Sequence, residues 1–243
     1  MLIGVISDLH ANLEATLAVL GKLDTIRPDR IVCLGDVAGY SANPNEVIDI
    51  LRQREIVTLM GNHDAAACGL EMPWFFNARA QAAIEWQAER LRTDNRHWLR
   101  DLPRTIRCDE SSLCVHGAPR NRDDYILDWL DAMRQLEFLN GTGIRVCFFG
   151  HSHFAALFGE KGSAPSAGTP DRHTLDRENR YLINPGSVGQ PRDGDSRAAF
   201  GLFETEAMTF EFHRVEYDIE ETARKIVDAG LPVELARRLP RGR

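Results

Sequence analysis

The sequence lacks a disulfide framework. It contains five cysteines, an odd number, and no two of them are separated by only two residues. Disulfide frameworks of small secreted proteins use an even number of cysteines. Cys33, Cys114 and Cys147 lie inside apolar runs, so we expect buried free thiols there, not redox or metal-binding groups. This use of cysteine favours a reducing compartment, and we predict a cytoplasmic protein.

A long hydrophobic run is also missing. A membrane-spanning helix needs roughly 20 consecutive apolar residues, and no stretch of this chain approaches that length. The apolar run at residues 1–6 is followed almost directly by Asp8, and it has no positive region before it and no cleavage site after it. It therefore does not resemble a secretory signal, and we expect no membrane partner.

The chain has a deficit of positive charge, because 29 Lys and Arg face 36 Asp and Glu for a net charge of −7. Binding to duplex nucleic acid draws on positive charge that displaces counterions, so this balance disfavours a duplex partner, although it is compatible with a local basic patch. Hydrophobic residues at 43% and charged residues at 27% are ordinary for a globular protein. A length of 243 residues suits one large α/β domain, predicted to span residues 1–243.

Strand and helix patterns alternate over the first sixty residues. Short apolar runs predict buried strands at residues 2–7, 31–34 and 56–60. Asn12 is suited to cap the first intervening helix, and Pro44 is suited to start the second. This βαβαβ order predicts parallel strands joined by right-handed crossovers.

The rest of the chain mixes both patterns. We predict two helices between residues 72 and 102, a helix around residues 129–139 and a closing helix at residues 219–229. Strands are predicted at residues 112–115, 145–149, 181–184, 198–204 and 209–215. The stretch 159–180, rich in Gly, Ser, Pro and charge, predicts a surface loop. We expect the basic tail to be solvated; it carries Arg237, Arg238, Arg241 and Arg243.

Five polar clusters stand at or just after the ends of predicted strands. They are Asp8-Leu9-His10, Gly35-Asp36, Gly61-Asn62-His63-Asp64, His116-Gly117 and Gly150-His151-Ser152-His153. Ligands of an open parallel sheet bind beyond the carboxyl ends of its strands, so these side chains share one rim. Carboxylate, imidazole and amide oxygen suit borderline divalent ions such as Mn, Fe or Zn. One such histidine alone would more commonly be structural, but five of the eight histidines fall in these clusters, which indicates a shared metal site.

These blocks resemble the calcineurin-like metallophosphoesterases, whose pattern is D-x-H, G-D, G-N-H-D/E, G-H and G-H-x-H in that order. The chain departs from it once, because Gly117 follows His116 where the pattern has glycine before the histidine. Residues 184–192, Asn-Pro-Gly-Ser-Val-Gly-Gln-Pro-Arg, are similar to a segment of the small bacterial phosphodiesterase-like members. The resemblance implies a four-layer αββα sandwich of two mixed sheets flanked by helices.

The resemblance also implies a site with two divalent ions, about 3.5–4 Å apart, that lower the pKa of a bound water. Residue by residue, it assigns Asp8, His10, Asp36 and His153 to one ion. It assigns Asp36, Asn62, His116 and His151 to the other, with Asp36 as the bridge. Mn, Fe and Zn all fit these ligand types, and the sequence does not choose among them.

His63 is the predicted catalytic residue. The resemblance gives the adjacent Asn62 the ligand role and makes the imidazole an acid or a hydrogen-bond donor to the phosphate in the transition state. The alternative is a turn histidine satisfied by backbone groups. Asp64 either orients His63 or bonds the turn.

Four residues near the motif blocks are candidates for substrate binding: Asn12, Tyr40, Arg120 and Arg192. Either guanidinium could hold a phosphate through two N–H donors. The alternatives are helix capping for Asn12 and surface salt bridges for the arginines. Residues 74–76, Trp-Phe-Phe, either pack in the core or form a pocket wall that stacks a base.

The leading hypothesis is a metal-dependent phosphodiesterase acting on a small or nucleotide-like phosphodiester. A phosphomonoesterase, including a protein phosphatase, is the nearest alternative, because the same metal centre serves both. A DNA nuclease is disfavoured by the acidic balance. A non-catalytic binding scaffold is the alternative of another class; a retromer subunit with this fold lacks the catalytic histidine, whereas His63 is present here.

Overall fold

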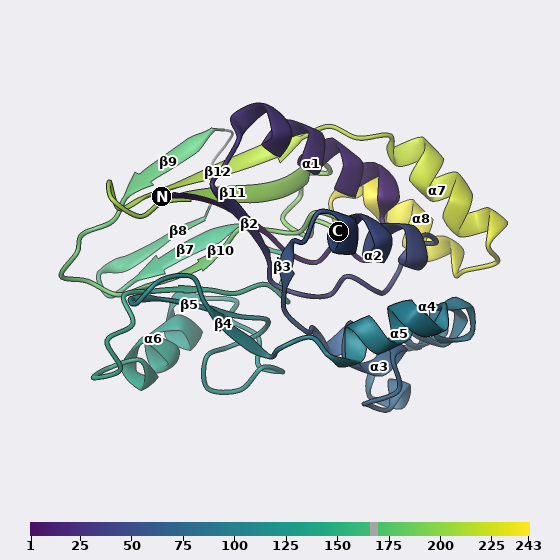
Figure 1. Cartoon of the computed structure of the whole chain (residues 1–243), viewed down its shortest axis with the longest axis horizontal. Coiled ribbons are helices and arrows are strands. Elements are labelled where there is room, and N and C mark those ends of the chain that lie inside the picture. Colours follow the sequence, from purple (N-terminus) through teal and green to yellow (C-terminus); the bar gives the residue numbers. More distant parts are fainter. Residues whose placement is uncertain (166–169) are drawn as a thin grey trace.

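The computed structural model describes residues 1–165 and 170–243. In these ranges two six-stranded sheets face each other, and helices cover their outer surfaces (Figure 1). Each sheet contains both parallel and antiparallel strand pairs. The predicted four-layer αββα sandwich of two mixed sheets is therefore confirmed.

The first sheet has the strand order β3-β2-β1-β11-β12-β9. Its strands are β1 (Leu2–Ile6), β2 (Arg30–Cys33), β3 (Val57–Thr58), β9 (Asp171–Thr174), β11 (Ala198–Glu204) and β12 (Thr209–Val215). The first three strands are parallel, as their βαβαβ pattern predicts, whereas β11 joins β1 in antiparallel register. β3 is shorter than the predicted strand at residues 56–60, because only Val57 and Thr58 pair with β2.

The second sheet has the order β4-β5-β6-β10-β7-β8. Its strands are β4 (Thr105–Arg107), β5 (Ser112–Val115), β6 (Val146–Phe148), β7 (Ala156–Gly159), β8 (Gly162–Pro165) and β10 (Tyr181–Asn184). The prediction of a surface loop at residues 159–180 is wrong for the described residues of that stretch, which include β8 and β9; residues 166–169 lie outside them. Both are edge strands, and β9 has residues of alternating exposure, so its polar composition resembles that of a loop.

Helices pack on the outer face of each sheet. They are α1 (Leu13–Ile26), α2 (Pro44–Gln53), α3 (Asn62–Ala67), α4 (Ala78–Arg90), α5 (Thr93–Arg100), α6 (Trp129–Phe138), α7 (Ile219–Asp228) and α8 (Val233–Arg238), with short 3-10 helices η1 (Pro73–Phe75) and η2 (Leu239–Arg241). Asn12 caps α1 as expected, accepting a hydrogen bond from the Ala15 amide. Among the described residues, no helix is both long and apolar enough to cross a membrane.

Three apolar layers hold this arrangement together. One lies between the first sheet and helices α1, α2 and α5, and includes Leu20 and Ile48. A second lies between the two sheets, where Phe148, Phe203 and Phe210 pack edge to face or tilted. The third joins the second sheet to α6. The carboxyl ends of β1, β2, β3, β5 and β6 consequently come to one side of the sandwich, and the five motif clusters follow them directly.

Candidate metal centre

The five motif clusters supply one buried group of side chains. Asp8, His10, Asp36, His116, His151 and His153 are all at most 6% exposed, and Asn62 is half-buried. Their carboxylate oxygens and imidazole nitrogens form compact sets, in which all ligand atoms lie within 4.8 Å of one another. The structure thus brings together every residue that the sequence predicts as a metal ligand.

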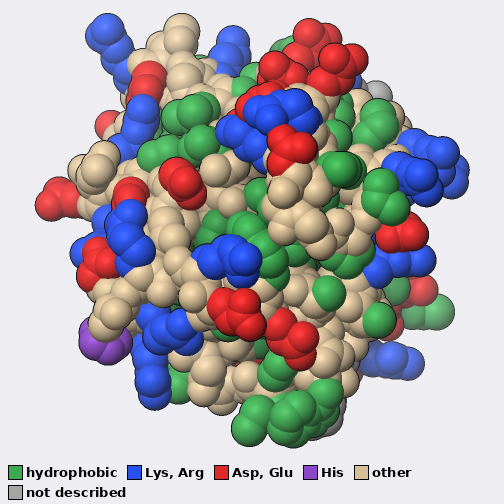
Figure 2. All heavy atoms as spheres, turned by 90° about the vertical axis from the view of Figure 1, so that its right-hand side faces the viewer, with side chains coloured by type: hydrophobic (Ala, Val, Ile, Leu, Met, Phe, Trp, Pro, Cys, Tyr) green, Lys and Arg blue, Asp and Glu red, His purple; other side chains and the backbone are tan. Residues whose placement is uncertain are grey.

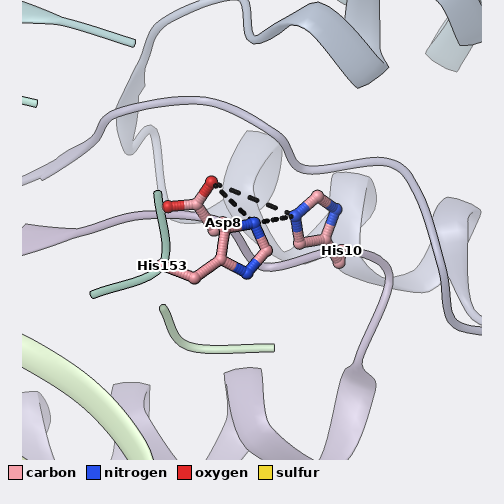
Figure 3. A group of neighbouring side chains, drawn as sticks. All are labelled: Asp8, His10 and His153. Atoms are coloured by element: carbon pink, nitrogen blue, oxygen red, sulfur yellow. Dashed lines mark hydrogen bonds and ion pairs between the residues drawn. The ribbon is translucent and has the colours of Figure 1, made fainter. Parts of the chain in front are cut away.

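The first set consists of Asp8, His10 and His153 (Figure 3). The Nε2 atoms of His10 and His153 lie 3.0 Å apart, and Asp8 Oδ1 lies 3.9 and 3.5 Å from them. Each Nδ1 donates to a backbone carbonyl, that of Ala38 at 2.9 Å for His10 and that of Gln190 at 2.6 Å for His153. A neutral imidazole that donates from Nδ1 presents a lone pair at Nε2, so two lone pairs and a carboxylate face one another.

The second set consists of Asp36, His116 and His151. His116 Nδ1 donates to the Leu34 carbonyl at 2.9 Å, and its Nε2 lies 3.0 Å from Asn62 Oδ1, where either a proton on the imidazole or a cation satisfies both atoms. His151 Nε2 is buried and has no hydrogen-bond partner. Acceptors that converge without a donor repel one another, and a cation among them removes the repulsion. The donor set of both groups therefore fits metal ions.

Asp36 lies between the two sets. Its Oδ2 is 3.7 Å from His10 Nε2 and 3.4 Å from His116 Nε2. Its Oδ1 accepts a hydrogen bond from the His63 backbone amide at 2.9 Å, which fixes the plane of the carboxylate. One oxygen within reach of both sets is the geometry that a bridging ligand requires.

The backbone at these residues is strained. Asp8, His10, Asp36, His151 and His153 all have positive φ, from 48° to 65°, a region that residues other than glycine rarely adopt. Such strain clusters at functional sites, where the surrounding structure enforces it. Close approach adds a second constraint, because a Cβ on Gly61 would lie 2.0 Å from Asp36 Oδ1. The G-N-H-D glycine is therefore needed for the Asp36 carboxylate to occupy its place.

Burial and neighbouring charges shift the pKa values of the ligand residues. Burial raises the pKa of Asp8 to about 6. Burial also raises the pKa of Asp36, but His116 and His63 outweigh it and hold that pKa well below its usual range. Burial lowers the pKa of His116, whereas Asp36 raises it to about 10. For His10 and His153, burial lowers the pKa far below the usual value, which keeps both imidazoles neutral and able to bind a cation.

His63 stands beside the metal ligands at the start of α3. Its ring contacts Tyr40 at 4.7 Å, Phe76 at 4.8 Å and His10 at 4.8 Å between centroids, and its Nδ1 is buried without a partner. Burial lowers the pKa of His63 to about 4. His63 also forms a compact set with His10 and Asp36, so distance alone is compatible with a ligand role.

Asp64 bonds the turn. Its carboxylate accepts from the amides of Ala38 at 2.8 Å and Gly61 at 3.0 Å, and the second contact caps α3. Burial raises the pKa of Asp64 to about 7. Asp64 was expected either to orient His63 or to bond the turn. Its contacts are those of a turn residue, and they connect the segment that follows Asp36 to the segment that contains Gly61.

A cavity of about 360 Å³ opens next to His63, and its lining includes Tyr40, Asn62, Phe76, Tyr125 and His151. Tyr40 is buried against His10, and its hydroxyl accepts a hydrogen bond from Arg192 at 3.1 Å, so two predicted substrate-binding residues meet here. Trp74 is 62% exposed, whereas Phe76 is half-buried, packs on the core and lines the cavity. The core and pocket-wall alternatives for Phe76 therefore both hold.

The other two predicted substrate-binding residues do not line this cavity. Asn12 is fully buried; its Nδ2 donates to the Gly189 carbonyl at 2.9 Å and its Oδ1 caps α1. Arg120 is exposed and lies in an adjoining hollow with Asp124 and Gln135. The contacts of Asn12 are those of the helix-cap alternative.

Two residues at the site were not anticipated. Tyr125 stacks on His151 with 3.9 Å between centroids, and no motif marks it. Arg238 of α8 is half-buried over the Tyr40 ring, which corrects the expectation that the whole basic tail is solvated. The charge of Arg238 was visible in the sequence, but the return of the C-terminal helices to Tyr40 was not.

Comparison with known proteins agrees with the site. The sequence model of the calcineurin-like phosphoesterase superfamily domain matches residues 1–208. An uncharacterized protein of Methanocaldococcus jannaschii is 37% identical over 248 residues, which cover 100% of this chain and 98% of that protein. The crystal structure of a metallophosphoesterase from Sphaerobacter thermophilus is 36% identical, with a TM-score of 0.88 and all of both chains covered. A hypothetical protein from Pyrococcus horikoshii OT3 shares the fold. Its crystal structure is 20% identical in sequence and has a TM-score of 0.83, with 100% of this chain and 98% of that chain covered. The chain belongs to the calcineurin-like phosphoesterase superfamily.

Proposed function

We propose that this protein is a two-metal phosphodiesterase that hydrolyses a small or nucleotide-like phosphodiester. One observation carries the proposal: a single oxygen of Asp36 lies 3.7 and 3.4 Å from the Nε2 atoms of His10 and His116, which belong to different ligand sets. Membership of a phosphoesterase superfamily supports the reaction class.

Each ion takes four protein ligands in this proposal. Asp8, His10, Asp36 and His153 hold one, and Asp36, Asn62, His116 and His151 hold the other. The ligand types suit Mn, Fe or Zn. Two such ions, when bound, activate a water and neutralise charge that develops on the phosphoryl oxygens. Burial of the ligands excludes bulk water, which strengthens these interactions.

His63 acts on the leaving oxygen. It projects beside the cavity while its backbone amide holds Asp36, so one residue fixes the bridging carboxylate and presents an imidazole to the substrate. The negative charge of a bound phosphoester opposes the effect of burial and favours the protonated ring, which then donates its proton or a hydrogen bond to the leaving oxygen. Adjacent Asn62 supplies the ligand oxygen, because its Oδ1 lies 3.0 Å from Nε2 of the proposed ligand His116.

A diester is favoured over a monoester because two aromatic side chains, Phe76 and Tyr125, line the cavity beside different histidines. Phe76 packs against His63, and Tyr125 stacks on His151. Each surface can contact one organic group of a diester, whereas a monoester would use one of them. Phosphomonoester hydrolysis, including that of phosphoproteins, is the second candidate, since the metal ligands serve both.

The setting of this activity is proposed to be one domain of residues 1–243 in the cytoplasm. The pairing of β1 with β11 supports a single domain, because it joins the two ends of the chain in one sheet. All five cysteines are free and buried, which supports a reducing compartment.

The test substitutes His63→Ala and compares esters with poor and good leaving groups. The variant should keep both ions in elemental analysis and lose roughly 10²–10⁴-fold in kcat on a poor leaving group, because it lacks the acid. The loss should shrink for nitrophenolate, which needs little protonation. His97→Ala, the same change at an exposed position of α5, serves as the matched control.

Two results would contradict the assignment of His63. Loss of an ion in His63→Ala would make the residue a ligand, as its distance to Asp36 permits. Full activity on a poor leaving group with both ions retained would make it a structural residue and would favour a binding scaffold.

A further inference from the structure

Two arginines from distant parts of the chain face the same tyrosine at the edge of the cavity. The guanidinium carbon of Arg192 lies 5.5 Å from the Tyr40 ring centroid, and that of Arg238 lies 5.9 Å from it. Arg192 follows β10 in the segment 184–192, whereas Arg238 ends α8. Both side chains are half-buried. The fold therefore places two positively charged groups within 5.9 Å of the ring centroid of Tyr40, which lines the cavity.

Aspartate and glutamate side chains do not pair with these charges. Over residues 1–165 and 170–243, neither Arg192 nor Arg238 forms an ion pair with an Asp or Glu side chain, and Arg238 Nε donates to the main-chain oxygen of Arg243, the last residue of the sequence. Burial, followed by repulsion from Arg192, lowers the pKa of Arg238 to about 10. Half-buried arginines usually have acidic partners, because removing a charge from water is unfavourable unless a partner compensates.

Several guanidinium donors remain available for a ligand. Arg192 donates from one terminal nitrogen, Nη2, to Tyr40 Oη and to Gln190 Oε1, both at 3.1 Å, and its buried Nε has no partner. Arg238 uses Nε for the Arg243 backbone oxygen. Guanidinium groups bind phosphate oxygens through paired N–H donors, so two of them beside one ring provide the chemistry of a phosphate site.

The position relative to the reacting centre suits a second group on the substrate. The Tyr40 ring lies 4.5 Å from His10 and 4.7 Å from His63. Arg192 adjoins the ligand group, because its backbone amide donates to the His153 carbonyl at 3.2 Å, whereas Arg238 approaches the Tyr40 ring from α8. Glu71 and Asp123 also line the cavity, but both lie within ion-pair distance of Arg122, which compensates their charge. A negatively charged group is therefore attracted to the Tyr40 side of the cavity, where the two arginines lie.

We propose that Arg192 and Arg238 form a subsite for a second phosphate group of the substrate, separate from the phosphoryl group that reacts at the metal centre. This inference rests on the proposed function and narrows its substrate class to phosphodiesters that carry a further phosphate. The two arginines determine specificity and touch no reacting atom.

The apolar contacts of α8 keep Arg238 in place independently of any ligand. Leu235 and Leu239 are buried with Tyr40, Ala80 and Ile226 in one core cluster, which joins α8 to α4 and α7. Figure 2 looks onto the side of the molecule that lies at the right of Figure 1, where acidic and basic side chains are interspersed. Such a mixed surface attracts a small anion only where the local charges are unpaired, as they are beside Tyr40.

The experiment compares two esters that differ in one group. The first is the 4-nitrophenyl phosphodiester of glycerol, and the second is the same ester with a phosphate on the terminal glycerol hydroxyl. The wild-type protein should hydrolyse the second with a kcat/KM about tenfold or more higher, mainly through KM, since charge-assisted hydrogen bonds contribute at least this factor. Arg238→Gln should reduce the ratio toward one, and Arg238→Lys should restore part of it.

Arg237→Gln is the matched control, because it removes the same charge from the exposed neighbouring position and should leave the ratio unchanged. Thermal unfolding verifies that each variant is folded. Hydrolysis of both esters by the wild-type protein without preference would overturn the subsite and leave the proposed function standing. Hydrolysis of neither would instead contradict the proposed function. If Arg237→Gln lowered the ratio of the two kcat/KM values as much as Arg238→Gln does, the preference would be a general effect of net charge and the subsite would be refuted.

Discussion

Replacement of Asp36 by asparagine should remove metal binding without unfolding the protein. Asp36 Oδ1 accepts from the His63 amide, so the side-chain oxygen of the introduced asparagine must take that place and its amide nitrogen must take the place of Oδ2. There it faces the Nε2 lone pairs of His10 and His116, at 3.7 and 3.4 Å from the atom it replaces. One new N–H can donate to His116 Nε2, and a small shift of the side chain brings the other within reach of His10 Nε2. The substitution therefore satisfies the acceptors that a cation would otherwise bind, and it eliminates the shared negative charge.

The size of the effect can be estimated from ligand linkage. An ion present at 100 times its Kd stabilises the folded state by about 2.7 kcal/mol. For a chain of this size, 1 kcal/mol corresponds to roughly 2–4 °C in Tm. Two ions should thus raise the Tm of the wild-type protein by roughly 10–20 °C relative to the chelated protein. Asp36→Asn should reduce this difference to a few degrees at most, and its metal content should fall below one ion per chain.

Calorimetry with and without chelator, together with elemental analysis, measures both quantities. Asp24→Asn makes the same chemical change at an exposed aspartate that pairs with Arg54, and it should leave the chelator effect unaltered. Two tightly bound ions in Asp36→Asn would refute the bridging role. An Asp36→Asn protein that is unfolded with or without metal would refute the proposed hydrogen bonds to His10 and His116.

Four further predictions concern the same site. Removal of metal by chelation should abolish hydrolysis and Mn or a similar ion should restore it, so full activity in a preparation shown to be metal-free would exclude the mechanism. His153→Ala should lower the metal content toward one ion per chain, because this residue belongs to one ligand set only. Gly39→Ala should reduce metal content and kcat together, because the new Cβ would lie 2.6 Å from Nδ1 of both His10 and His63. Gly141 also has a positive φ but lies in open space, so the control Gly141→Ala should affect stability alone. Finally, kcat/KM should be higher for an aryl phosphodiester than for the matching monoester under the same metal, and the reverse order would favour the phosphatase.

The gathering of the ligand residues at one edge was predictable because it depends on a local signal and a general rule, whereas their division between two ions was implied by the family resemblance. Each ligand follows an apolar run that reads as a strand, and the carboxyl ends of parallel strands meet at one edge. β1 and β2 pair in parallel with Ile6 opposite Cys33, which places Asp8 and Asp36 at the same level of the sheet. No information about the distant parts of the chain was needed for this step.

Features that depend on distant contacts were not predictable in the same way. β9 is a polar edge strand whose pattern becomes regular only through its pairing with β12. Arg238 reaches Tyr40 because α7 and α8 fold back onto α4 through a small apolar cluster, and nothing near Arg238 in sequence marks that contact. Tyr125 stacks on His151 from a loop without a motif. In each case the partner lies far away in sequence, so local pattern and propensity carry no signal.

Charge balance links the metal centre to the arginine pair. In the proposed assignment, two divalent ions face only two carboxylates, those of Asp8 and Asp36, so the ligand set retains two positive charges. Arg192 and Arg238 add two more beside Tyr40, without Asp or Glu partners in the described ranges. A simple phosphodiester carries one negative charge and would leave most of this excess uncompensated. A substrate with a further phosphate brings the missing charges to the side where the arginines lie. The positive charge that remains once both ions are bound, together with that of the two arginines, therefore favours a multiply charged substrate.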